Sequence, residues 1–206
     1  MKKAIPCKIL ISGMTIMTLL LVGCGTSPPA KFYTLTPVVV QKPEEKVVHA
    51  EKNMPVGIGP IEIPDYLDRP EIVTRAEQNQ LILSEFNLWG GTLKADINRV
   101  LLENISSFLA GDEIPIITWK AAMTEAHRVP VVIARFDGSP NGSITLKARW
   151  SLLDKEGKAF EHFRETNITI PVNGGSYGSV VTAMSEALGE LSKEIAAGIK
   201  SVVKKK

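Results

Sequence analysis

The sequence predicts an α+β fold, in which a mainly antiparallel β-sheet packs with two amphipathic helices as a sandwich, both helices lying on one face. Apolar and polar residues alternate from residue 143 to 153, as on a strand with one buried face. In residues 93–109 and 177–202 the apolar positions instead recur every three or four residues, which indicates helices. Because strands precede each helix and short turns join the later strands, an antiparallel sheet is favoured.

The first half of the chain contains four short strand patterns before its helix. They are residues 31–37 (KFYTLTP), 56–64 (VGIGPIEIP), 71–75 (EIVTR) and 80–85 (QLILSE). The Gly-Pro pair inside the second pattern predicts a bulge. The helix that follows is expected to end near Gly111, because glycine commonly stops a helix.

Four more strand patterns follow. They are residues 113–119, 128–138, 143–153 and 159–172, and the last three are expected to form a meander with short turns. The final strand alternates imperfectly around residues 162–165, which predicts a bulge or an exposed edge there. The apolar stripe of the closing helix is expected to pack on the sheet, with a helix–helix or oligomer seam as the alternative.

The start of the chain has the pattern of a bacterial export signal. Three lysines precede an apolar stretch, residues 9–22, which ends in Leu21-Val22-Gly23-Cys24. This ending resembles the lipobox of bacterial lipoproteins, which implies that Cys24 becomes the first residue and carries a diacylglycerol and an N-acyl chain. The alternatives are an ordinary signal peptide with a chance cysteine, or a transmembrane anchor, which needs about 20 apolar residues.

These observations divide the chain into a signal peptide (residues 1–23), a lipidated N-terminus with a short strand and a linker (24–53), and one α+β periplasmic domain (54–206). Removing the signal peptide removes three of 24 basic residues and none of 22 acidic ones, so the mature charge is 21 − 22 = −1. Nothing in this charge favours nucleic acid as a partner. With Cys7 discarded and Cys24 acylated, no disulfide is expected.

The segment 174–178 (GGSYG) matches G-x-S-x-G, the nucleophile turn of many serine hydrolases. No aspartate or histidine follows Ser176, however, and the three histidines of the chain all precede it. We therefore interpret Ser176 as a helix N-cap after two glycines that allow the chain to turn. The histidines also lack metal-ligand spacing, so neither a catalytic residue nor a metal site is predicted.

Two stretches, residues 61–75 (IEIPDYLDRPEIVTR) and 79–105 (NQLILSEFNLWGGTLKADINRVLLENI), carry a family resemblance. Together with the lipobox and the early FYTL, they resemble the ABC-type transport auxiliary lipoproteins of the PqiC type. One departure is the run 89–93 (WGGTL), where relatives usually have Trp, Ala or Gly, Glu, Pro, Leu. That loop is expected to differ locally.

The resemblance implies a non-enzymatic lipoprotein of an envelope-spanning lipid transport system, without a cofactor other than its acyl chains. Its implied partner is a periplasmic MCE-type protein that forms an oligomeric conduit, and a homo-oligomer of this chain would suit such a partner. By the sorting rule of enteric lipoproteins, Gly25 in place of Asp implies lipid anchoring in the outer membrane, with the domain facing the periplasm. An adaptor or assembly lipoprotein of an outer-membrane β-barrel or secretion channel is the alternative, and a lipid-handling serine hydrolase is a further one.

The proline-bounded segment PDYLDRP is a candidate docking surface. We hypothesise that Tyr66, Leu67 and Arg69 contact the partner, because tyrosine and arginine are enriched among interface anchors. The alternative is that Tyr66 and Leu67 pack into the core while Arg69 pairs with Asp65 or Glu71. The acidic residues of this stretch, Glu62, Asp65, Asp68 and Glu71, are interpreted as part of a polar loop with local charge pairs rather than as a cation or acid-base site.

Overall fold

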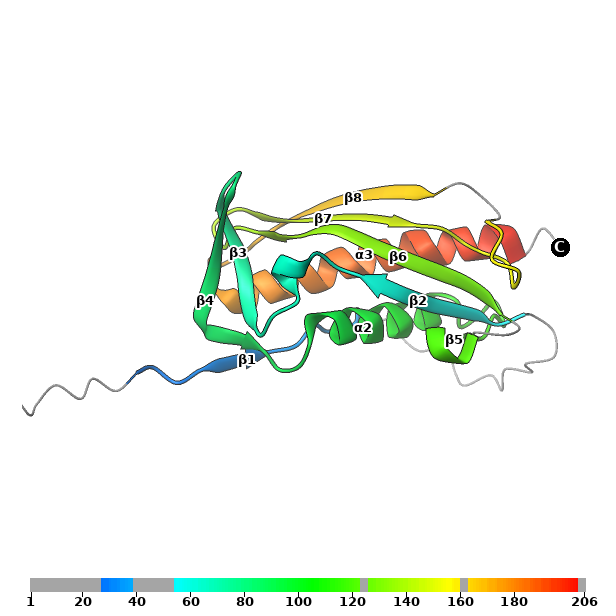
Figure 1. The fold of residues 1–206 in the computed structure, drawn as a ribbon, viewed down its shortest axis with the longest axis horizontal. Helices are drawn as coiled ribbons and strands as arrows, with labels where there is room; N and C mark the ends of the chain where they lie inside the picture. The colour runs from blue at the N-terminus through cyan, green and yellow to red at the C-terminus, as the bar shows by residue number, and fades with distance from the viewer. Residues whose placement is uncertain (1–26, 39–53, 123–125, 160–162, 204–206) are drawn as a thin grey trace, which may run out of the picture.

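The computed structural model describes residues 27–38, 54–122, 126–159 and 163–203 (Figure 1). The strands are β1 (Lys31–Tyr33), β2 (Val56–Glu62), β3 (Glu71–Glu77), β4 (Gln80–Trp89), β5 (Ile116–Thr118), β6 (His127–Gly138), β7 (Ser143–Trp150) and β8 (Arg164–Pro171). The α-helices of the described residues are α2 (Leu93–Phe108) and α3 (Tyr177–Val203). Two short 3-10 helices, η1 (Asp65–Leu67) and η2 (Trp119–Ala122), complete the order.

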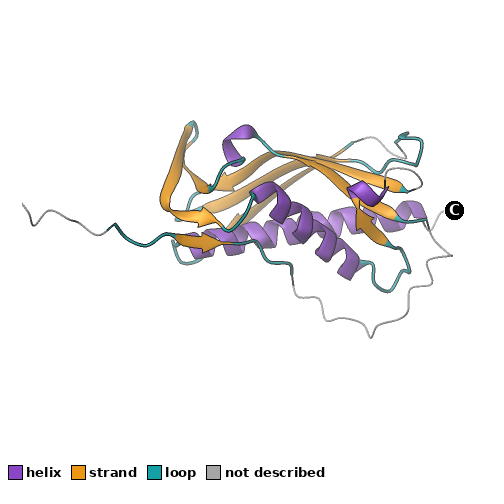
Figure 2. Ribbon diagram, turned by 60° about the horizontal axis from the view of Figure 1, so that its bottom comes forward, coloured by secondary structure: helices purple, strands orange, loops and turns teal. Residues whose placement is uncertain are grey.

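A five-stranded sheet forms the body of the domain, with the strand order β5-β2-β6-β7-β8. Strands β6, β7 and β8 are antiparallel, as expected for the meander, whereas β2 runs parallel to both β5 and β6. Both helices lie on one face of this sheet (Figures 1 and 2). Helix α2 packs against β2 and β5, helix α3 packs against β7 and β8, and the two helices contact each other. The predicted α+β sandwich is confirmed.

A second, three-stranded sheet stands at one end of the large sheet and has the order β1-β4-β3 (Figure 1). Strand β4 pairs antiparallel with β3 and parallel with β1, with Phe32 opposite Leu88. The sequence pattern predicts one sheet, and the structure has two because β2 pairs with the distant strand β6. Strands β3 and β4 therefore leave the large sheet and pair with the N-terminal strand instead.

The alternating strand β7 confirms its predicted dry and wet faces. Its apolar side chains, Ile144, Leu146, Ala148 and Trp150, are buried against the helices, and Lys147 and Arg149 between them are exposed. The indole of Trp150 lies directly against Gly198 of α3, where a Cβ atom would approach the ring to 2.6 Å. The apolar stripe of the closing helix therefore packs on the sheet, as predicted.

The irregular points of the fold also follow the sequence. The register of β2 against β6 shifts between Ile58 and Ile61, around Gly59 with a φ of 112°, which confirms the predicted bulge. Strand β8 is an edge of the large sheet, as expected, while the proposed bulge falls partly on residues 160–162, outside the described residues. Helix α2 ends at Phe108, three residues before Gly111. No helix among the described residues is long and apolar enough to span a bilayer.

Candidate functional site

The expected docking loop, residues 64–70, connects the large sheet to the small one. It begins with η1, in which the Leu67 N–H donates to the Pro64 carbonyl at 2.9 Å. It ends against the small sheet, because the Trp89 N–H donates to the Pro70 carbonyl at 2.7 Å. The loop is therefore tied to the sheets at both ends and has a defined shape.

Leu67 of this loop belongs to the hydrophobic core, with only 2% of its surface exposed. A side chain this buried presents no surface to a partner in this conformation, which corrects the expectation that Leu67 is a docking contact. The residue instead anchors the loop, since burying a leucine stabilises a fold by about 1.5–3 kcal/mol. Its flanking residues Asp65 and Asp68 are exposed, so the outer surface of the loop is polar.

Tyr66 is half-buried and bonds to an acid from the other sheet. Its hydroxyl donates to Oδ2 of Asp137 on β6 at 2.6 Å. Arg75 on β3 binds the same carboxylate with two nitrogens, Nε at 2.7 Å and Nη2 at 2.9 Å, and Arg135 adds a bond from Nε at 3.0 Å. We call Tyr66, Arg75, Arg135 and Asp137 the Asp137 network. It joins the loop, the small sheet and the large sheet at one point.

The electrostatics of the network explain how a fully buried carboxylate is tolerated. Burial of Asp137 favours the neutral acid, but hydrogen bonds from Arg75 and Tyr66 and the charges of both arginines outweigh it, so the pKa of Asp137 lies below its usual value. Burial, followed by the hydrogen bond to Asp137 and its negative charge, raises the pKa of Tyr66 to about 12. The hydrogen bond to Asp137 likewise raises the pKa of Arg75. Around neutral pH Asp137 is therefore negatively charged and Arg75 positively charged, while the Tyr66 hydroxyl keeps its proton and donates it to the acid.

Arg69 differs from its neighbours because it has no ion pair in the described part of the chain. Its side chain is partly exposed, and its Nε is buried without a hydrogen-bond partner among these residues. The expected alternative, a salt bridge from Arg69 to Asp65 or Glu71, is not formed in this structure. Arg69 therefore keeps its hydrogen-bonding capacity at the edge of a rigid loop.

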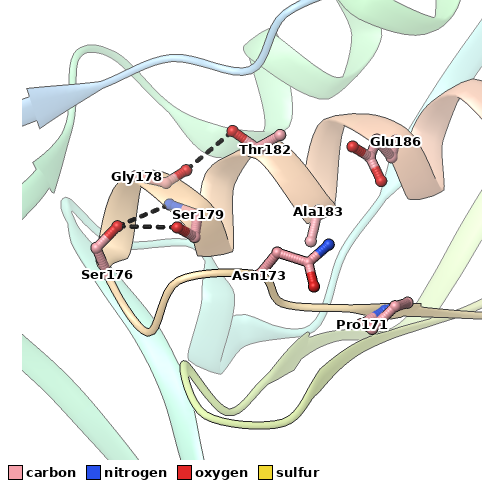
Figure 3. A pocket seen from close by; sticks show the side chains of 8 residues that line it. All are labelled: Pro171, Asn173, Ser176, Gly178, Ser179, Thr182, Ala183 and Glu186. Atoms are coloured by element: carbon pink, nitrogen blue, oxygen red, sulfur yellow. Dashed lines mark hydrogen bonds between the residues drawn. The ribbon is translucent and has the colours of Figure 1, made fainter.

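The turn that contains Ser176 is a helix cap. Ser176 Oγ accepts a hydrogen bond from the Ser179 N–H at 3.1 Å and lies 3.0 Å from the Ser179 hydroxyl (Figure 3). Gly174 and Gly175 before it have φ values of 112° and 65°, which favour glycine. The interpretation of Ser176 as the N-cap of α3 is thus confirmed.

The surroundings of Ser176 do not supply a catalytic triad. The turn borders a depression of about 290 Å³ that also contains Glu186, ten residues further along α3 and so roughly 15 Å away (Figure 3). His127, the histidine of the described residues, is the first residue of β6. The Ser176 turn follows β8 and lies near the last residue of β6, so it is roughly 35 Å from His127. Neither Glu186 nor His127 is therefore beside Ser176, whose side chain is hydrogen-bonded to Ser179.

The N-terminal segment after β1 is fixed along the two helices, a feature that sequence reasoning missed. Leu35 is completely buried. Its N–H donates to Asp96 Oδ2 at 2.5 Å, and its carbonyl accepts from Arg99 Nη2 at 2.6 Å, both from α2. Further along, the Val38 N–H donates to Asn104 Oδ1 at 2.9 Å. We call residues 34–38, which follow β1, the strap.

The strap also contacts α3. The Thr36 N–H donates to Ser185 Oγ at 3.1 Å, and the side chain of Val38 covers Gly189, where a Cβ atom would lie 2.6 Å from it. One sequence signal was available, because the polar residues Asn104 and Ser185 interrupt the apolar stripes of their helices. Buried polar groups require hydrogen-bond partners, and the strap supplies them.

Cys24 lies outside the described residues, so the structure does not test its acylation. Among the described residues, no group of three or more His, Cys, Asp or Glu side chains could hold a metal ion. What the structure brings together is thus a strap, which connects the N-terminus to the core, and a rigid polar loop beside the Asp137 network.

Comparison with known proteins assigns this chain to a family. Residues 33–196 match the family described as ABC-type transport auxiliary lipoprotein component. The chain is 23% identical over 145 residues to the intermembrane transport lipoprotein PqiC of Escherichia coli K12, and the match covers 70% of this chain and 74% of that protein. The protein of the same name from Shigella flexneri matches equally.

Solved structures share the fold. An uncharacterized protein superposes with a TM-score of 0.69 at 19% identity, covering 84% of this chain and 99% of its own. A protein of Xanthomonas campestris superposes with a TM-score of 0.65 at 14% identity, covering 85% of this chain and 97% of its own. At these identities the likeness concerns the fold alone.

Proposed function

The chain belongs to the family of ABC-type transport auxiliary lipoprotein components, and from this membership we propose that it is a non-enzymatic lipoprotein of an intermembrane lipid transport system. In this role the lipoprotein is anchored in the outer membrane through Cys24 and holds the end of a periplasmic MCE-type conduit there. The observation that carries the proposal is the match of residues 33–196 to the family, together with the lipobox that ends at Cys24.

The anchor has a clear physical role. Stable membrane attachment takes about two acyl chains, because each buried CH₂ adds about 0.8 kcal/mol, and the lipobox chemistry supplies three on one residue. A tethered domain then meets a partner near the bilayer at an effective concentration of about mM without any new contact. The strap connects the N-terminal segment to the folded domain, since its backbone is hydrogen-bonded to side chains of both α2 and α3.

The docking surface that we propose is the outer side of the loop 64–70, with Tyr66 and Arg69 as its principal residues and Leu67 as its internal anchor. The loop is already ordered, so a partner loses little conformational freedom on binding it. Arg69 offers a partly exposed side chain without an ion pair in the described residues, and Asp65 and Asp68 are exposed acidic residues. Such a surface suits a polar protein partner.

Site-specific crosslinking in intact cells tests this role. A photoreactive residue replaces exposed Asp68, and a matched control replaces exposed Lys158, in the turn after β7 at the far end of the large sheet (Figure 1). We expect the position 68 probe to capture an MCE-type periplasmic protein, identified by mass spectrometry, and the position 158 probe not to capture it. Capture of a β-barrel or secretion channel instead would support the adaptor alternative.

Charge reversal sharpens the same test. Arg69→Glu should reduce the capture at position 68, while Lys158→Glu leaves it unchanged, and both variants should unfold at the temperature of the parent because both side chains reach the surface. Equal capture by the two variants would remove Arg69 from the docking surface.

A further inference from the structure

One face of the large sheet is not covered by the α-helices of the described residues. Helices α2 and α3 lie together on the opposite face, against the buried apolar side chains of the sheet (Figure 2). Successive side chains of a strand point to opposite sides of a sheet, so Thr145, Lys147 and Arg149 of β7 project from the other side. Lys147 and Arg149 are both exposed there. We call this side the outer face of the large sheet.

Three basic side chains of the outer face are neighbours. Arg135 of β6 lies directly opposite Lys147 of β7, and Arg149 lies two positions further along β7. Paired strands are about 5 Å apart and every second residue of a strand is about 7 Å away, so the three Cα atoms lie within roughly 8 Å of one another. We call Arg135, Lys147 and Arg149 the basic patch.

The basic patch places two like charges opposite each other. Like charges that face each other across paired strands destabilise a sheet, and the chain nevertheless has this arrangement at Arg135 and Lys147. Arg135 is partly compensated, because its Nε donates to Oδ1 of Asp137 at 3.0 Å, but the same carboxylate also binds Arg75. Positions at which a sequence departs from the local rules of stability are commonly functional.

The other two cations of the patch are not paired within the domain. Neither Lys147 nor Arg149 forms an ion pair with a residue that the structure describes. Glu165 of β8 lies opposite Arg149, and Glu62 of β2 lies in the same row of the sheet, opposite Val132 of β6. Both acids are exposed and border the patch without binding it. The outer face thus presents unpaired cations with an acid on either side.

The basic patch adjoins the loop 64–70. The Tyr66 hydroxyl and Arg135 Nε bind the two oxygens of one carboxylate, that of Asp137. Asp137 lies on the outer face, opposite Thr145 and two positions from the partner of Lys147. A specific protein interface covers about 800 Å² on each side. A protein that docks on the outer side of the loop therefore has the basic patch within the same footprint.

We infer that the basic patch binds an acidic surface of the same periplasmic protein that docks on the loop 64–70. The inference rests on the proposed docking and describes the chemistry of its partner. A carboxylate placed beside Lys147 and Arg149 compensates the charges that the isolated domain leaves unpaired, and such complementarity speeds association and fixes the register of a complex. Anionic membranes are recognised by clusters of about 4–8 basic residues, whereas three cations bordered by two acids suit a protein that presents both charges.

Zero-length crosslinking in intact cells tests the inference. A water-soluble carbodiimide joins a lysine amine to a carboxylate without a spacer, so it links groups that are already in contact. Lys200 and Asp112, whose charged atoms are 2.9 Å apart, are the internal positive control. Lys94 of α2 is the matched negative control, because it is exposed on the helix side of the sheet and has no ion pair among the described residues. Mass spectrometry identifies the linked peptides.

We expect Lys147 to be linked to aspartates or glutamates of the protein that the position 68 probe captures, and Lys94 not to be linked to that protein. Equal links from both lysines would overturn the inference. So would links from Lys147 only to its own chain or to a second copy, or no link from Lys147 while Lys200 and Asp112 are joined. Capture at position 68 without links from Lys147 leaves the docking proposal intact, whereas a lack of capture at position 68 contradicts that proposal itself.

Charge reversal provides a second readout. Lys147→Glu should lower capture at position 68 by about tenfold, because it places like charges against each other in the complex. Lys147→Arg should retain capture, and so should Lys94→Glu. The Lys147→Glu protein should unfold at or above the temperature of the parent, since an attractive pair then replaces a repulsive one opposite Arg135. Unchanged capture by the folded Lys147→Glu protein would remove the basic patch from the interface.

Discussion

Two turns of this molecule carry sequences that resemble functional motifs, and the structure holds them by opposite means. The loop 64–70 depends on Asp137, which is 71 positions from Tyr66 in the sequence. The turn at Ser176 depends on Ser179, three positions away. A motif that is held by local bonds can be assigned from the sequence by local rules, whereas one that is held by distant residues gains its meaning only from the fold.

Removing the distant partner should have the largest effect. Asp137→Ala leaves Arg75 and Arg135 as neighbouring cations without their shared acid, and breaking a buried pair in this way costs about 3–5 kcal/mol. Urea unfolding measures the loss. Asp65→Ala, at an exposed carboxylate in the loop itself, should change stability by less than about 0.5 kcal/mol. Similar losses in the two variants would show that the loop does not depend on the network.

The apolar anchor of the loop should have the next largest effect. Leu67→Ala removes a side chain that is 2% exposed, and such truncations cost about 2–5 kcal/mol. Thermal unfolding measures this loss, and in-cell crosslinking at position 68 measures docking. We expect a lower unfolding temperature with docking retained wherever the protein is folded. Loss of docking at unchanged stability would instead mean that Leu67 contacts the partner.

The sequence predicts elements that rest on local patterns and fails where pairing is long-range. The alternation from Ile144 to Trp150 and the stripe of α3 are visible in the chain, because neighbours in sequence set each pattern. The parallel pairing of β1 with β4 joins residues more than 50 positions apart, so no local pattern announces the second sheet. The Asp137 network cannot be predicted from the sequence for the same reason, since Asp137 lies on β6 of the large sheet and Tyr66 lies in the loop 64–70.

The pH dependence of stability should show how far the loop 64–70 depends on the charge of Asp137. The pKa of Asp137 is lower in the folded protein than its ordinary value of 3.8, so its stabilising effect is fully present above that value. The effect is lost as the pH falls through the lower, folded-state pKa, because the carboxyl is then protonated in both states. Free energies of unfolding measured across this acidic range should decline more steeply for the parent than for Asp137→Asn. Parallel curves would mean that Asp137 titrates alike in both states.

The smallest effect is expected at the local turn. Ser176→Ala removes the acceptor of the Ser179 N–H, and the loss of an N-cap costs about 1 kcal/mol. Ser176→Asp should retain that stability, because aspartate caps a helix equally well and favours the positive end of its dipole. Neither change should affect docking at position 68, and neither should alter hydrolysis of a model ester. Ester hydrolysis that both substitutions abolish would instead identify Ser176 as a nucleophile, since aspartate preserves the cap but not the hydroxyl.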